Sequence, residues 1–538
     1  MTDLYRCRIP GIFLALITSV VGMALPASAA EGPRMVVSIM IDGLDDQYVE
    51  LLRSKFGPDG FNRLLRDGVI IANADYGTNV DPTAAAAMVM TGASPNITGV
   101  SGAEVYDRPT GRIRSVMFDA DAMGNFTSQT FSPKALSVST LSDEVRIAGG
   151  GVNRVFSIAA DPSMAIVTAG HSAGAALWIN DETGNWATST YYKDLPSSVT
   201  YRNRLRPLAA RLDTLQWTPV APESSYPGLP EHLTHYKFRY TFPRANSDRY
   251  AMFAASPMVN TEVTDLATEL IDDLKLGTAE AGAPDMINVT YSLRPYDYTR
   301  NSDNRYELMD SYLRLDRDLS RLMTKADNAA GKDGAVYIVA ALPPSGRTRR
   351  DDERWNIPFG EFSTKRAKSL LNMYLMAKFG NGEWVTSFYE GQFFLNHKLV
   401  ESAGVSAHDI RREAADFLER MTGVSRVITI DEILSGRGDS RLEAMQRNVN
   451  PAGSGDLFVE VAPGWETVDD IVTPADPSRP VYVSRMTPPL APVFILAPDL
   501  DARTIDTPVD IRVIAPTVAR ILRIRSPNAA AMPPLSLK

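Results

Sequence analysis

One short run of residues restricts the fold more than any other feature of this chain. Met35 to Ile41 is almost wholly apolar and rich in β-branched residues, and it ends at Asp42-Gly43. Such a run is typical of a central strand that is buried on both faces, as in a parallel sheet covered by helices on both sides. We therefore predict an α/β fold with a central, mainly parallel sheet flanked by helices on both faces.

Other apolar segments supply the remaining strands and a connecting helix. The predicted strands are Val69–Ala72, Val155–Ile158, Ala165–Thr168, Met286–Tyr291, Ala335–Ala341, Leu457–Val461 and Pro492–Ala497. Between two of them, apolar residues recur every three or four positions at Leu308, Tyr312, Leu315, Leu319 and Leu322. This spacing predicts an amphipathic helix that joins two parallel strands in a β–α–β crossover.

The N-terminus has the pattern of an export signal. Arg6 and Arg8 precede an apolar run over residues 9–25, and the small residues Ala27-Ser28-Ala29 follow it. This pattern predicts a signal peptide over residues 1–30, a periplasmic or secreted protein, and no membrane span in the mature chain.

The remaining chain, residues 31–538, is predicted to form one domain with two insertions. Residues from about 180 to 260 are rich in proline and aromatic residues and show no periodicity, so we interpret them as an inserted cap. Residues from about 345 to 425 form a second insertion, which is predicted to be helical around 370–379.

Composition limits the partners and the metal chemistry. The formal net charge is −9, and lysine and arginine are not clustered, which argues against a nucleic-acid partner. An unidentified small molecule or envelope protein remains the expected partner. The chain has only five histidines and one cysteine, so the usual ligands of a zinc site are scarce.

Several motifs near the N-terminus share their layout with a known family. They are Ile41-Asp42-Gly43-Leu44 at a strand end, Gly60 to Leu65, Thr91-Gly92-Ala93-Ser94-Pro95, Gly99-Val100 and Tyr106-Asp107. In this layout the chain resembles the alkaline phosphatase superfamily, and within it the type I phosphodiesterase/nucleotide pyrophosphatase-like branch. The resemblance implies an alkaline phosphatase-like fold and a two-metal phosphoester hydrolase. In such an enzyme, two cations about 4 Å apart hold the attacking and leaving oxygens.

The same resemblance implies where the functional residues should stand, and most are missing. Asp42 fills the first metal-ligand position, but the nucleophile position falls on Pro82, with Thr83 one residue later. The other metal-ligand positions fall on Pro295, Thr299, Pro344, Ser345 and Leu490. The positions that contact phosphate fall on Asp161, Ser163 and Ala103. We expect the strand-end positions to converge at one edge of the sheet.

Two hypotheses about function follow. The first is a pseudoenzyme that keeps the fold as a binding or scaffolding module and needs no cofactor. The second is a phosphomonoester or phosphodiester hydrolase with an altered metal site, in which Asp42, Asp81 and Asp297 hold a single divalent cation and Thr83 is the nucleophile. Oxygen ligands of this kind suit Mg²⁺, Mn²⁺ or Ca²⁺ rather than zinc.

Two further side chains are candidates for binding, and each has a structural alternative. His171 follows a predicted strand, where it is either a hydrogen-bonded histidine or a ligand or proton shuttle in a changed pocket. Asp297 is either a slipped metal ligand or a solvated loop carboxylate. His232 and His235 lie three residues apart, but their proline-flanked setting favours a solvated loop.

Overall fold

The computed structural model describes residues 32–77, 80–229, 231–233, 236–278, 284–299, 303–331, 333–343, 347–349, 360–450, 453–468, 482–484 and 490–537. The predicted signal peptide, His235, Pro344 and Ser345 lie outside these residues. Among the described helices, none combines the length and the apolar composition that crossing a membrane requires.

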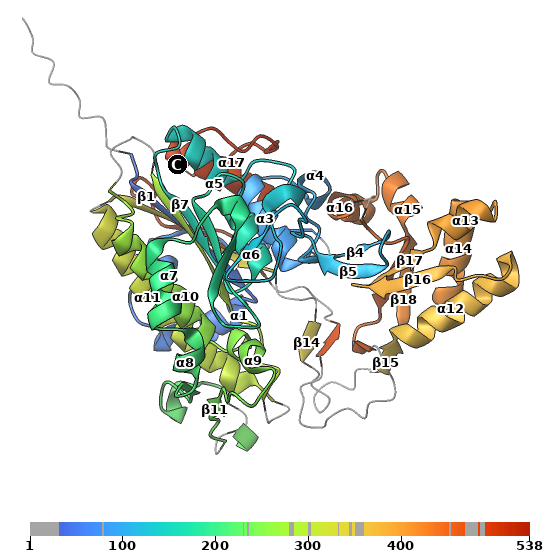
Figure 1. Cartoon of the computed structure of the whole chain (residues 1–538), viewed down its shortest axis with the longest axis horizontal. Coiled ribbons are helices and arrows are strands. Elements are labelled where there is room, and N and C mark those ends of the chain that lie inside the picture. The colour runs from blue at the N-terminus through green and yellow to red at the C-terminus, as the bar shows by residue number, and fades with distance from the viewer. Residues whose placement is uncertain are drawn as a thin grey trace, which may run out of the picture.

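A ten-stranded mixed sheet with a parallel centre forms the core of the molecule (Figure 1). In spatial order its strands are β23 (Arg503–Ile505), β2 (Val69–Ile71), β22 (Val493–Leu496), β13 (Ala335–Leu342), β1 (Met35–Asp42), β12 (Asp285–Ser292), β7 (Val155–Ile158), β8 (Ala175–Ile179), β9 (Trp186–Ser189) and β6 (Gly124–Asn125). The strands from β13 to β8 are parallel, whereas β22, β9 and β6 pair in antiparallel fashion. All eight residues of β1 are buried, so the predicted sheet and its central strand are confirmed.

Helices cover the sheet on both sides, as predicted (Figure 1). One group contains α1 (Asp46–Leu52), α2 (Phe61–Asp67), α10 (Met258–Asp273) and α11 (Arg305–Ala330). The other contains α3 (Pro82–Thr91), α5 (Leu141–Ala148), α6 (Pro162–Ala169) and α17 (Ile514–Leu522). Helix α11 connects β12 to β13, the two neighbours of β1, and this confirms the predicted crossover.

Two strand predictions need correction. Ala165–Thr168 belongs to helix α6, which begins with Pro162 and is capped by the Asp161 side chain. Seven of the eight residues of α6 are buried between the sheet and neighbouring helices, so its sequence has no polar face to reveal a helical period. Leu457–Val461 is a strand, β19, but it belongs to a separate sheet.

That separate sheet lies in a region that we call the lateral subdomain, residues 360–450 and 453–468 (right of Figure 1). Its four strands are β16 (Val385–Tyr389), β17 (Gln392–Leu395), β19 (Leu457–Val461) and β18 (Val424–Thr429). Its helices are α12 (Thr364–Phe379), α13 (His397–Ser402), α14 (Ala407–Leu418), α15 (Ile430–Ser435) and α16 (Ser440–Asn448). Phe362, Leu371 and Trp384 belong to a core of its own, apart from that of the main sheet.

The interval predicted as a cap packs differently. It contains β9 of the main sheet, helices α7 (Ser197–Leu205), α8 (Leu208–Leu212) and α9 (Arg249–Ala255), and the short strands β10 (Gln216–Trp217) and β11 (Tyr240–Thr241). Trp186 and Trp217 are buried in the same core as the main sheet. The remaining short elements are β3 (Ala74–Asp75), α4 (Pro95–Thr98), β4 (Glu104–Asp107), β5 (Arg112–Ser115), β14 (Arg347–Arg349), β15 (Gly360–Ser363), β20 (Trp465–Val468), β21 (Tyr482–Ser484) and β24 (Val509–Asp510).

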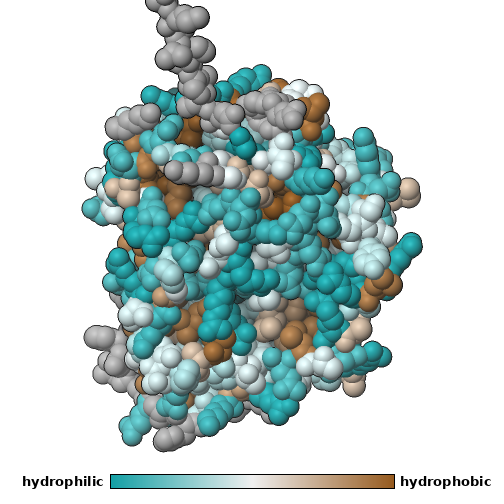
Figure 2. Space-filling view, turned by 90° about the vertical axis from the view of Figure 1, so that its left-hand side faces the viewer, coloured by the Kyte–Doolittle hydropathy of each residue, from teal (hydrophilic) through white to brown (hydrophobic). Residues whose placement is uncertain are grey.

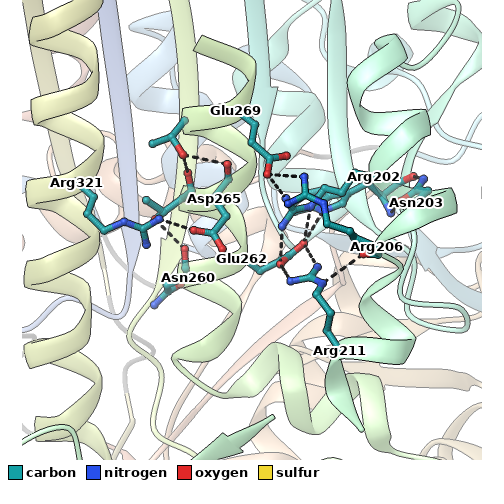
Figure 3. A network of polar contacts seen from close by, with 12 residues as sticks. Arg202, Asn203, Arg206, Arg211, Asn260, Glu262, Asp265, Glu269 and Arg321 are labelled. Atoms are coloured by element: carbon teal, nitrogen blue, oxygen red, sulfur yellow. Dashed lines mark hydrogen bonds and ion pairs between the residues drawn. The ribbon is translucent and has the colours of Figure 1, made fainter. Parts of the chain in front are cut away.

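A buried ion-pair network joins α7 and α8 to α10 (Figure 3). Glu262 of α10 is 3% exposed, and it accepts hydrogen bonds from Arg202, Arg211 and the Trp186 indole. Arg202 also donates to Glu269, which lies about two helical turns further along α10. Burial acts to raise the pKa of Glu262, but the two arginines outweigh it and lower that pKa. The network therefore holds a charged carboxylate inside the protein.

The outer face formed around α7, α10 and α11 is mostly hydrophilic. Figure 2 shows hydrophobic side chains on this side only in small separate groups. A face of this kind lacks the continuous apolar patch that marks a large protein interface.

Candidate functional site

The carboxyl ends of β1 and β12 bring Asp42 and Arg294 together. The two strands pair in register, with Asp42 opposite Ser292. The Leu293 amide then donates a hydrogen bond of 2.7 Å to the Asp42 carbonyl, which holds the chain beyond β12 against the end of β1. Arg294 therefore follows the strand directly beside the Asp42 side chain.

Gly43 makes this close approach possible. Its φ is +80°, and a Cβ atom there would lie 3.1 Å from the Leu293 carbonyl carbon and 3.2 Å from the Arg294 nitrogen. Both the backbone conformation and the space therefore favour glycine.

Replacing Gly43 by alanine is expected to lower the free energy of unfolding by about 2 kcal/mol. Alanine is strained at a positive φ, and its methyl group would also clash with the backbone after β12. Urea unfolding of the purified protein measures the change. Gly151 is the matched control, since it has φ +81° but nothing within 4 Å of the added methyl group. An equal loss in both variants would show that the contact with Leu293 and Arg294 is unimportant.

Asp42 and Arg294 form an ion pair at this strand end. The Arg294 Nε donates to Asp42 Oδ2, and the Asp42 side chain is 9% exposed, whereas that of Arg294 is 63% exposed. Burial raises the pKa of Asp42, while the Arg294 charge and hydrogen bond oppose this rise. Asp42, where the resemblance implies the first metal ligand, thus has a cationic partner in the protein.

Two more carboxylates act on the same arginine. Asp81 caps α3 by accepting a 2.7 Å hydrogen bond from the Thr83 amide, and Asp161 caps α6 by accepting one of 3.0 Å from the Met164 amide. The charges of Asp42, Asp161 and Asp81 together raise the pKa of Arg294. With three carboxylates around one guanidinium, the site disfavours a phosphate dianion.

The donor set does not fit a two-metal centre. Within the described part of the chain, no group of three or more histidine, cysteine, aspartate or glutamate side chains is placed to hold a metal ion. Pro295 offers no ligand, and the buried Thr299 donates its hydroxyl hydrogen bond to Glu307 while accepting one from Tyr240. Leu490 is 41% exposed and apolar.

The predicted site residues are brought together only in part. Thr83 is buried in the first turn of α3, beside the Asp81 cap. Asp297 is exposed in a turn after β12. The structure thus brings Asp42 and Asp81 to Arg294, and leaves Asp297 at the surface of that loop.

His171 lies at the other end of α6 from Asp161. Its Nδ1 is 3.1 Å from Asp143 Oδ2 and its Nε2 is 2.9 Å from the Leu136 carbonyl, so both ring nitrogens face acceptors. The Asp143 hydrogen bond accordingly raises the pKa of His171. Eight residues of helix span about 12 Å, which separates this imidazole from the Asp42 end of the sheet. The remaining described histidine of the predicted pair, His232, contacts Asp303.

Arg294 is the residue that sequence reasoning missed. The family spacing identified Pro295 and Thr299 as the expected ligand positions, but it did not identify Arg294, which precedes Pro295. The available signal was position: a basic residue directly after a strand that pairs in parallel with the strand of Asp42.

The β4–β5 hairpin of the main part of the molecule contacts the lateral subdomain. Arg108 in its turn donates to the Ser454 carbonyl at 2.8 Å and to Asp456 at 3.1 Å. Tyr389 of β16 donates to Glu104 of β4 at 3.0 Å. Burial and the Glu104 hydrogen bond raise the pKa of Tyr389, and the Asp81 charge adds to the rise, so β16 lies within electrostatic reach of the site.

A family model described as type I phosphodiesterase / nucleotide pyrophosphatase matches residues 36–341. The chain belongs to this family. This family member is 27% identical over 94% of its length to a protein of Myroides odoratus named calcium-transporting ATPase, and 94% of that protein is covered. It is 25% identical over 95% of its length to alkaline phosphatase PafA of Elizabethkingia meningoseptica, of which 96% is covered.

Solved structures confirm the fold of this family member. The crystal structure of wild-type PafA superposes with a TM-score of 0.79 over 94% of this chain and 99% of that chain, at 24% sequence identity. The predicted alkaline phosphatase-like fold and the resemblance to the type I phosphodiesterase branch are both confirmed.

Proposed function

We propose that this protein is an exported member of the family that has lost two-metal phosphoester hydrolysis and acts as a binding or scaffolding protein. The observation that carries the proposal is the Asp42–Arg294 ion pair, because it occupies the first metal-ligand carboxylate with a protein cation. Pro82 at the nucleophile position supports it, since proline has no nucleophilic side chain. The arginine-flanked apolar run at the N-terminus supports export.

The electrostatics of the site also favour a ligand other than a phosphate ester. Asp161 stands where the resemblance implies a phosphate-contacting cation, and burial raises the pKa of this carboxyl. A ligand that is neutral or carries a positive group suits three carboxylates better than a dianion does. An unidentified small molecule or a protein of the cell envelope is the proposed partner.

The alternative is an active hydrolase with an altered metal site. The name alkaline phosphatase carried by PafA favours it, as does the placement of Thr83 at the start of α3 beside Asp81. In that reading Thr83 is the nucleophile and Asp42 retains a divalent cation.

Metal analysis with an activity assay decides between the two. We expect less than 0.1 zinc per chain and hydrolysis of aryl phosphates and phosphodiesters indistinguishable from that of the Asp42→Ala variant. Loss of even one transition-state charge stabiliser commonly costs about 10²- to 10³-fold, so the loss of several leaves no rate above background. Near-stoichiometric metal together with turnover that Asp42→Ala abolishes would support the altered hydrolase instead.

A further inference from the structure

We propose that the Arg294 guanidinium is the resident cation of this strand-end site: it stands against Asp42 where the family relies on a metal ion, and it makes the local structure independent of divalent cations. The inference rests on the proposed function, because it concerns the same site. It goes further by naming the residue that compensates the negative charge of Asp42 in the absence of a metal ion.

The burial of Asp42 creates the need for a cation. Its side chain is 9% exposed at the end of a strand whose eight residues are all buried. A carboxylate in such a place is costly unless it is paired, since isolated burial of a charge is strongly unfavourable. Arg294 Nε supplies the pairing from a position two residues beyond the end of the neighbouring parallel strand, β12.

The backbone fixes the arginine in position. The 2.7 Å hydrogen bond from the Leu293 amide to the Asp42 carbonyl extends the β1–β12 pairing by one residue beyond the ladder. Pro295 comes next, and a residue before proline is restricted to extended conformations. The proline that removes a family ligand therefore also reduces the freedom of the arginine before it.

Arginine suits this task because of its permanent charge. It stays protonated at any physiological pH, and its several donors can satisfy one carboxylate while the rest of the group faces others. Asp81 and Asp161 act electrostatically on the same guanidinium, so its charge interacts with carboxylates at the end of β1 and at the N-caps of α3 and α6. A divalent cation at Asp42 would have to compete with Arg294 for Oδ2 of this carboxylate.

Hydrogen exchange of peptides from the ends of β1 and β12 tests the proposal on the full mature chain. In the wild type, we expect EDTA, Zn²⁺ or Mg²⁺ to change exchange in these peptides by less than twofold. Arg294→Met is expected to raise their exchange by roughly tenfold or more, because Asp42 is then buried without a partner. Arg294→Lys, which keeps a charge, should restore part of the protection.

Further variants distinguish loss of the Asp42–Arg294 ion pair from a general loss of stability. Asp42→Asn combined with Arg294→Met should return most of the protection, since no unpaired carboxylate remains. Arg441→Met is the control: Arg441 is 46% exposed and paired with Glu460 in the lateral subdomain, so its loss should leave the β1 and β12 peptides unchanged. The proposal is overturned if EDTA raises wild-type exchange, if Arg294→Met matches the Arg441 control, or if the double variant recovers nothing.

The outcome is distinct from that of the proposed function. Phosphoester turnover with cation-independent exchange would contradict the pseudoenzyme alone. Cation-dependent exchange without turnover would contradict the role of Arg294 alone.

Discussion

Replacing Asp456 by asparagine is expected to destabilise the protein by about 3 kcal/mol at pH 7. The Asp456 side chain is 1% exposed, forms ion pairs with Arg108 and Arg411, lies 2.8 Å from His397 Nε2, and accepts the Leu395 amide at 2.8 Å. Asparagine keeps the shape but leaves two largely buried arginines without their shared counter-charge. Urea unfolding followed by circular dichroism measures the loss.

The effect of this substitution should depend on pH in a defined way. Burial acts to raise the pKa of Asp456, but the His397 hydrogen bond and the Arg108 charge outweigh it and lower the pKa to about 2. Because the folded-state pKa lies below the ordinary value of 3.8, the carboxylate stabilises the fold above pH 4. This stabilisation is lost as the pH falls from about 4 to about 2, so wild type and variant should converge there.

Asp431→Asn is the matched control for this experiment. Asp431 pairs with the same Arg411 but is 30% exposed, so its replacement should cost less than about 1 kcal/mol. If Asp456→Asn lowers the free energy of unfolding no more than Asp431→Asn does, the contact between the turn of the β4–β5 hairpin and the lateral subdomain does not depend on a buried charge.

The second large effect is expected at the network of Figure 3. Replacing Glu262 by glutamine should cost about 3 to 4 kcal/mol, because Arg202, which is 4% exposed in its side chain, and Arg211 then lose a charged acceptor inside the protein. The thermal midpoint and the urea midpoint should both fall.

Glu269→Gln provides the comparison within the same helix. Glu269 accepts from Arg202 and from the exposed Arg206, and its own side chain is 30% exposed, so the expected cost is under about 1 kcal/mol. Equal losses in the two variants would mean that burial of Glu262 adds nothing to the strength of the network.

The sequence predicted those strands and helices whose pattern of apolar residues follows directly from which of their faces are buried. The run ending at Asp42 is apolar throughout because both faces of β1 are buried, and the stripe from Leu308 to Leu322 is periodic because α11 has one face against the sheet. Residues 165–168 were wrongly predicted as a strand, because a helix that is buried on all sides is as uniformly apolar as a buried strand.

At the candidate site, the sequence predicted mainly which of the family's expected side chains are missing. Family spacing identified Asp42 and the substituted positions, and the structure brings Asp81 and Asp161 to the same strand end. The cation that pairs with Asp42 was predictable only in part: Arg294 follows the strand next to β1, but sequence spacing does not tell which side chain after β12 turns toward Asp42. For His171 only the element before it was predicted wrongly: it follows helix α6, and its contacts with Asp143 and the Leu136 carbonyl agree with the hydrogen-bonded alternative.

The pairing of Asp42 with Arg294 also limits how this sequence can change over evolutionary time. A lineage that removes Arg294 first passes through a protein with an uncompensated buried carboxylate, and one that removes Asp42 first gives up a metal ligand. Under the role proposed for Arg294, a histidine or aspartate introduced at Pro295 or Thr299 alone does not create a metal site, because Arg294 still pairs with Asp42. A metal site at this strand end then needs at least two substitutions, one of which removes the arginine.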